Sequence, residues 1–260
     1  MNTQRTKWGA MPFVAVNVAG VLAFAMPFFL SAPQTQESSA RSSDSVWLMV
    51  LLTAMLIAVA LSEAAGGKMD SKAVALLGVL AALAAVMRIP ISLAGANLVY
   101  LIPIVAGYVF GSSFGFVLGA TAMLVSAGIT GFIGPWVPFQ MWAMGWVGAG
   151  AGLLRPLGGR PRAGIAALAI YGYAAALFYG AVMNLYSWPL VANPSEIGWA
   201  PGLGLAETVR HYRSFYLLTS LAWDAFGGVV NVIGILILGA PLTALLARYR
   251  DRFLVEWTSP

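Results

Sequence analysis

The chain contains 260 residues, of which 60% are hydrophobic and only 9% are charged, and its mean hydropathy is +0.84. Soluble domains carry about 25% charged residues, so this composition excludes an ordinary soluble protein and indicates an integral membrane protein. The net charge is +5, but the 14 basic residues are spread over many loops and form no basic stripe with interleaved aromatic residues, so we expect no nucleic-acid partner. Because the chain contains no cysteine, disulfides and thiolate metal sites are also excluded.

Long uncharged stretches mark the predicted membrane helices. No charged residue lies between Arg88 and Arg155, and residues 163–195 and 225–247 are uncharged as well. About 20 apolar residues cross the hydrocarbon core of a bilayer, so each stretch predicts one or more spanning helices. We therefore predict an all-α membrane protein with eight transmembrane helices, over residues 11–30, 46–65, 72–88, 97–110, 113–132, 138–154, 164–188 and 215–247.

The basic residues predict the orientation of these spans. Cytoplasmic loops are enriched in Lys and Arg, and with the N-terminus inside, most of the 14 basic residues fall on the inner side. We therefore expect both termini in the cytoplasm, with residues 11–30 retained as a span because this run is longer than the apolar region of a signal peptide. The basic residues on the outer side are then Arg41, Arg88, Arg210 and Arg213.

Glycine spacing predicts close helix packing. Gly111, Gly115 and Gly119 recur every four residues, as do Gly148 and Gly152. Small residues at this spacing lie on one helix face and allow two helix backbones to approach closely in lipid. We interpret both sets as packing surfaces.

The span over residues 72–88 carries two further pairs of small residues, Gly78 with Ala82 and Ala81 with Ala85. These pairs fit packing within this chain, and they also fit docking against a partner membrane protein. Composition alone does not choose between the two.

Polar and aromatic residues gather near the predicted outer ends of the spans. Asp224 is the one carboxylate well inside a predicted span, and Asn231 follows it on roughly the same helix face. An acid at this depth is expensive and is a candidate functional residue, although a structural hydrogen bond to a neighbouring helix explains it equally well. The nearby tryptophans fit either an interfacial belt or a binding site.

The remaining polar residues do not indicate an enzyme. His211 is the only histidine, and we expect it to lie solvated in an outer loop, so neither an imidazole zinc site nor a Ser–His nucleophile can be assembled. The glycine-rich run Gly148–Gly152 lies inside an apolar span and fits helix packing rather than nucleotide binding. We therefore expect no catalytic activity, no cofactor and no metal.

From Met69 onward the chain resembles the substrate-specific S components of energy-coupling factor (ECF) vitamin transporters. The most specific block is Gly134–Met141, with the sequence GPWVPFQM, which leads into the glycines before Leu154. The other similar segments are Met69–Ala82, Phe114–Ala120, Asn184–Pro189 and Thr219–Asp224.

The resemblance implies a six-helix core over residues 67–260, preceded by two additional transmembrane helices within residues 1–66. It implies a subunit of the bacterial cytoplasmic membrane that lacks ATPase activity and captures a water-soluble vitamin or vitamin precursor from the outside. In the family, the S component delivers its ligand by docking on a transmembrane T component that two cytosolic ATPases drive.

The family's docking surface is an Ala-x-x-x-Ala pattern on the first core helix. Here Ala81 and Ala85 fit that spacing, and so do Gly78 and Ala82 with glycine substituted. In the family, the loop between the first two core helices roofs the ligand site, and the corresponding loop is Ile89–Ala96.

The residue pattern and the resemblance both point to the outer end of the bundle as the ligand site. Aromatic side chains would supply stacking area there, and the amides and the carboxylate would orient the ligand through hydrogen bonds. With one embedded acid and no embedded base, we expect a neutral or weakly cationic ligand rather than a strongly anionic one. The candidate ligand-binding residues are Asn97, Trp136, Gln140, Asn184, Trp188, Trp223 and Asp224.

Two other classes of protein fit the same sequence. A stand-alone secondary transporter of a small neutral solute would be supported by broken helices and embedded charge pairs. A non-transporting membrane assembly factor would use the same small-residue grooves but would need no ligand pocket. Dependence on ATP through a partner distinguishes an ECF S component from a secondary transporter. Binding of a small ligand distinguishes both of these from an assembly factor.

Overall fold

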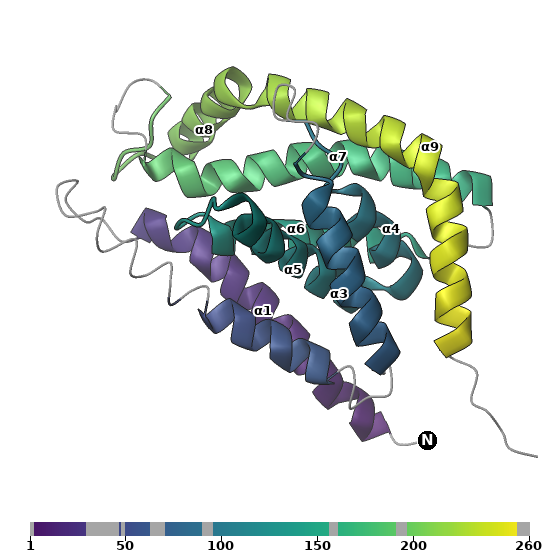
Figure 1. Ribbon diagram of the computed structural model, residues 1–260. Coiled ribbons are helices and arrows are strands. Elements are labelled where there is room, and N and C mark those ends of the chain that lie inside the picture. The colour runs from purple at the N-terminus through teal and green to yellow at the C-terminus, as the bar shows by residue number, and fades with distance from the viewer. Residues whose placement is uncertain are drawn as a thin grey trace, which may run out of the picture.

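The computed structural model describes residues 3–29, 47, 50–62, 71–89, 96–155, 161–190 and 197–253. The regular elements within these ranges are all helices, and the long helices α7 and α9 run along one side of the bundle (Figure 1). The elements are α1 (Thr3–Phe29), the segment Val50–Ser62, α3 (Ser71–Val86), α4 (Leu101–Phe110), α5 (Ser112–Thr130), α6 (Val137–Gly152), α7 (Pro161–Ser187), the short 3₁₀ helix η3 (Trp188–Leu190), α8 (Leu205–Thr219) and α9 (Leu221–Phe253).

Three helical stretches in the described part of the chain are long and apolar enough to cross a membrane: Ser112–Thr130, Arg162–Ser187 and Leu221–Asp251. Shorter apolar helices accompany them. One of these, α4, has 10 residues and extends about 15 Å, half the thickness of a bilayer core. This pattern is consistent with the predicted helical membrane protein.

Close backbone contact between α5 and α6 holds the centre of the bundle. A Cβ atom at Gly115 would overlap the carbonyl oxygen of Gly148, and a Cβ atom at Gly148 would overlap that of Gly115. Gly119 and Gly152 lie equally close to backbone atoms of the facing helix. The predicted packing role of these four glycines is confirmed, and it follows from the way small residues let helices approach in lipid.

Gly111 does not belong to this contact, contrary to the sequence-based prediction. It lies between α4 and α5 with φ of 104°, a backbone conformation that favours glycine. The turn folds α4 back among its neighbours, so that residues 101–109 are all buried. The span predicted over residues 97–110 is therefore a short helix inside the bundle, in contact with α3, α5, α6, α7 and α9.

Turn-forming residues decide where the helices begin and end. Ile89 precedes Pro90, and a residue before proline disfavours the helical conformation, which explains the end of α3 at Val86. Gly131 terminates α5 in a left-handed conformation with φ of 71°. Pro138 lies in the first turn of α6, where its missing N–H breaks no helical hydrogen bond.

The last predicted span, residues 215–247, is wrong at its start. Residues 215–219 belong to the separate helix α8, and the chain breaks direction at Ser220 before α9 begins. From there α9 continues for 33 residues and bends in its C-terminal half (Figure 1). Pro241 lies inside α9, and an interior proline removes a helical hydrogen bond and kinks a helix.

The N-terminal helix α1 packs directly onto α6. The indole N–H of Trp142 donates a hydrogen bond to the Val16 carbonyl at 2.9 Å, and the indole N–H of Trp146 donates to Asn17 Oδ1 at 2.8 Å. Gly20 lies against both indole rings, with no room for a side chain. The additional N-terminal helix therefore supplies hydrogen-bond acceptors to a buried indole, Trp142, and a half-buried one, Trp146.

The glycine contact predicts a difference between two matched substitutions in α5. Gly115→Ala forces a methyl group into the backbone of α6 and should destabilise the fold by roughly 1–3 kcal/mol, the usual effect of overpacking. Gly128→Ala places the same methyl group where no atom lies within 4 Å, and it should leave stability unchanged or raise it slightly. Thermal unfolding in mild detergent compares the two, and equal melting temperatures would contradict the packing described above.

Candidate functional site

One end of the bundle contains a cavity of about 290 Å³ with a largely polar lining, called here the polar chamber. It lies where α3, α5 and α7 approach their C-terminal ends and α4, α6 and α9 begin. This is the end that the predicted topology assigns to the outside. The lining residues are Arg88, Asn97, Val99, Tyr100, Met123, Gln140, Tyr179, Gly180, Met183, Asn184, Ser220 and Asp224.

Asp224 lies in the first turn of α9, where the helix dipole favours a negative charge. Its carboxylate packs against the backbone of α7 at Gly180, so closely that a Cβ atom there would overlap it. The Oδ2 atom is buried and has no hydrogen-bond partner among the described residues. A buried carboxylate oxygen without a partner is destabilising, which makes Asp224 a candidate for contact with a ligand.

The polar chamber also contains a base, contrary to the expectation of one embedded acid and no embedded base. Arg88 follows the end of α3 and lines the cavity. Its Nη1 donates a hydrogen bond at 3.2 Å to Oγ of Ser126, a fully buried residue of α5. The sequence pattern placed Arg88 among the loop charges because it ends an apolar run, but its side chain turns inward.

Two tyrosines lie near both charges. The rings of Tyr100 and Tyr179 meet edge to face, with centroids 5.5 Å apart and an interplanar angle of 88°. Both tyrosines interact electrostatically with Arg88 and with Asp224. Both hydroxyl groups therefore lie within electrostatic range of the two charged groups.

The amide side chains join different helices around the chamber. Asn184 on α7 and Ser220 before α9 exchange two hydrogen bonds, from Asn184 Nδ2 to Ser220 Oγ at 2.8 Å and from Ser220 Oγ to Asn184 Oδ1 at 3.1 Å. Asn231, which is fully buried, donates at 3.2 Å to the backbone carbonyl of Asn97. Asn231 thus ties α9 to the segment before α4, whereas the side chains of Asn97 and Gln140 line the cavity itself.

Helix α8 lies beside the chamber and bonds to α7. The hydroxyl of Tyr212 donates to the Ala181 carbonyl, and that of Tyr216 donates to the Leu177 carbonyl at 3.3 Å. Burial and the nearby carboxylate of Asp224 raise the pKa of Tyr212 to about 12, so this hydroxyl remains a donor at neutral pH.

The expectation that His211 is a solvated loop residue is wrong. His211 lies on α8 and is buried, and its Nδ1 is 2.8 Å from the backbone carbonyl oxygen of Gly198. The hydrophobic pattern of α8 explains this position, because His211 and Phe215 lie four residues apart on the inward face of an amphipathic helix.

The structure places Asn97, Gln140, Asn184 and Asp224 together in the chamber, but the three predicted tryptophans lie elsewhere. The Trp136 ring packs over Gly134 in its own turn and is 37% exposed. Trp223 does not line the cavity and is 58% exposed. Trp188 is buried, donates to the Ile197 carbonyl at 2.8 Å and packs among other aromatic rings, and it does not line the chamber.

Sequence reasoning missed Arg88, Tyr100, Tyr179, Gly180 and Ser220. Helical spacing offered a signal for two of them, because Gly180 precedes Asn184 by one helical turn and Ser220 precedes Asp224 by the same interval. The two tyrosines had no such signal, since an aromatic residue in an apolar segment is most often a packing residue.

The predicted docking residues on α3 are divided between two faces. Ala81 and Ala85 are buried inside the bundle, where α3 packs on α5 and α4, so they are not available to a partner. Gly78 and Ala82 are exposed, and a Cβ atom at Gly78 would meet nothing within 4 Å. Of the two residue pairs that fit the docking pattern in the sequence, only Gly78 and Ala82 lie on a free face of the described structure.

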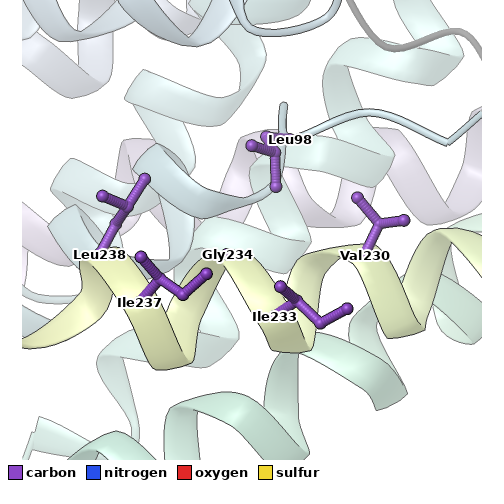
Figure 2. A pocket seen from close by; sticks show the side chains of 6 residues that line it. All are labelled: Leu98, Val230, Ile233, Gly234, Ile237 and Leu238. Atoms are coloured by element: carbon purple, nitrogen blue, oxygen red, sulfur yellow. The ribbon is translucent and has the colours of Figure 1, made fainter.

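A second cavity, of about 330 Å³, is entirely different in character. Leu98 lies over Gly234, between the aliphatic side chains along one face of α9 (Figure 2). A Cβ atom at Gly234 would clash with Leu98, so the glycine makes room for that side chain. This groove offers only apolar contacts and cannot orient a polar ligand. Its remaining lining residues are Val230, Ile233, Ile237 and Leu238.

The described residues contain no group of three or more His, Cys, Asp or Glu side chains that could hold a metal ion. The lining of the chamber itself offers hydrogen bonding and charge pairing, through Arg88, Asp224, the amides and the tyrosine hydroxyls. Of the loop predicted to roof the ligand, residues 90–95 lie outside the described residues.

A scan against protein-family models found no match, and comparisons with curated proteins and with solved structures likewise gave no significant match.

The different positions of the tryptophans predict different effects on stability. Trp188→Ala removes a fully buried ring with its hydrogen bond and should destabilise the protein by roughly 3–5 kcal/mol. Trp223→Ala changes an exposed ring that lines no cavity and should leave stability within about 0.5 kcal/mol. Thermal unfolding of both variants in the same detergent is the measurement. A large loss of stability for Trp223→Ala would show that its exposed position is incorrect.

Proposed function

We propose that this chain is the substrate-binding membrane subunit of an ECF-type importer, which captures a small water-soluble vitamin or vitamin precursor outside the bacterial cytoplasmic membrane. The polar chamber is the observation that carries the proposal. An acid, a base, two tyrosines and several amides surround one cavity in a bundle that is otherwise apolar. Polar groups at this depth are expensive, and packing alone does not require them.

The proposal keeps the predicted alternation of helix direction, with both termini in the cytoplasm and the short helix α4 enclosed in the bundle. In that topology α3, α5 and α7 run outward and α4, α6 and α9 run inward, so the polar chamber opens to the outside, where a ligand would be captured. Two ATPases and a T component would supply the energy, because the chain itself has no nucleotide-binding motif.

The exposed face of α3 supports the docking part of the proposal. Gly78 and Ala82 lie one helical turn apart on that face, and Val79 and Leu83 beside them are 59% and 50% exposed. A flat small-residue strip flanked by apolar side chains suits the close approach of a partner helix in lipid.

A second function, a stand-alone secondary transporter, is favoured by one specific observation. Arg88 and Asp224 share the chamber, and an embedded pair of opposite charges is typical of substrate and ion pathways. Uptake into liposomes containing only this chain, driven by an imposed ion gradient without ATP, would support this function over the importer.

The docking proposal predicts loss of partner binding from one matched substitution. The tagged chain is isolated in mild detergent from its native host, and the wild type should carry a T-type membrane protein and two ATPases. Gly78→Leu should reduce their recovery at least tenfold, because the new side chain fills the strip on α3. Quantitative mass spectrometry of the eluted proteins provides the measurement.

Gly128→Leu is the control for this experiment, because Gly128 is also an exposed helical glycine with no atom within 4 Å of a Cβ position. It should retain the partners. Undiminished recovery with Gly78→Leu would disprove the docking surface, and absence of ATPases from the wild-type complex under crosslinking conditions would count against the importer itself.

A further inference from the structure

Two opposite charges share the polar chamber without neutralising each other. Arg88 and Asp224 both line the cavity, yet within the described part of the chain neither forms an ion pair at the 4.0 Å limit. The ion pairs found there involve residues of α8 and the C-terminal end of α9 instead.

Both groups retain unused hydrogen-bonding capacity. A guanidinium carries five N–H donors, and among the described residues Arg88 donates one hydrogen bond, to Ser126 Oγ at 3.2 Å. Asp224 Oδ2 is buried and accepts no hydrogen bond from the described residues. Among the described residues, the chamber therefore presents unused donors on Arg88 and one unused acceptor, Oδ2 of Asp224, whose carboxyl group also interacts with the side chain of Tyr216.

This arrangement limits the charge that a ligand can carry. Removing one partner from a buried charge is strongly destabilising, because the remaining charge is left uncompensated. A purely anionic ligand would pair with Arg88 and leave Asp224 alone, and a purely cationic ligand would do the reverse. A ligand with both charges compensates both residues and adds no net charge to the membrane.

We propose that the chamber binds a small zwitterion, with its anionic group on Arg88 and its cationic group on Asp224. The proposal rests on the ligand-binding function proposed above and names its substrate class. It refines the sequence-based expectation of a neutral or weakly cationic ligand: the molecule is neutral overall but carries a separate charge at each end.

The size and walls of the chamber agree with such a ligand. A cavity of about 290 Å³ is at the small end of the range for ligand sites. Met123 and Met183 contribute flexible thioether walls, which suit the short carbon chain between two charged groups, and the hydroxyls of Tyr100 and Tyr179 offer further hydrogen bonds.

The test uses a series of straight-chain ω-amino acids, from glycine to 6-aminohexanoate, as probes of the distance between the two charges. Each is compared with the carboxylate that lacks its amine and the amine that lacks its carboxylate. Binding to the full-length chain in mild detergent is measured from ligand-dependent shifts in thermal unfolding. At one chain length, the apparent Kd of the zwitterion should be at least tenfold lower than that of either single-charge analogue.

Two substitutions separate the charged ends. Arg88→Gln should remove the advantage of the zwitterion over the amine, and Asp224→Asn should remove its advantage over the carboxylate. Arg250→Gln and Asp251→Asn are matched controls, since these two residues pair at 2.9 Å outside the chamber, and both should retain the full preference. Gly180→Ala keeps every charge but displaces the Asp224 carboxylate, so it should weaken zwitterion binding as well.

The proposal is overturned if no ω-amino acid of the series binds the wild-type protein more tightly than both of its single-charge analogues. It is also overturned if the preference for the zwitterion survives both Arg88→Gln and Asp224→Asn. Stronger binding of the amines alone would identify a cationic ligand, and stronger binding of the carboxylates alone an anionic one. These measurements require no partner protein, so failure to recover ATPases would reject the importer and leave zwitterion binding to be judged separately.

Discussion

The rest of the structure depends on the backbone contact between Gly115 of α5 and Gly148 of α6. Helices in lipid gain little from the hydrophobic effect when they associate, because lipid tails are as apolar as their side chains. Close packing must supply the attraction, and two glycines that face each other allow it. The pair holds α5 and α6 together, α4 is enclosed beside them, and the opposite face of α6 presents its indoles to α1.

The same two helices also leave space for the chamber. In the C-terminal half of α5 and the first turn of α6 larger side chains replace the glycines, and Met123 and Gln140 line the cavity there. The positions of the glycines along α5 and α6 thus decide where the two helices touch and where they are separated. Residues of α7 and α9 also line the chamber, where Gly180 makes room for the carboxylate of Asp224.

Much of the fold and part of the site followed from local sequence features. The helical character, the glycine contacts and four chamber residues were predictable, because a polar residue in an apolar segment and a four-residue glycine repeat are distinctive. The tryptophans misled the prediction, since an indole near a helix end suits a belt, a core or a pocket equally. Arg88 was missed for the corresponding reason: a charge at the end of a span ordinarily faces water.

By itself, the sequence determined a helical protein of membrane type and the residues through which its helices touch, because composition and spacing act along each helix. Tertiary structure alone decided that Arg88 and Asp224 share one cavity, that His211 is buried, and that Gly78 rather than Ala81 lies on the free face of α3. These outcomes depend on how each helix is rotated about its axis and on where it ends relative to its neighbours. Contacts between residues far apart in the chain determine the rotation and the end point, so a local sequence pattern cannot predict either.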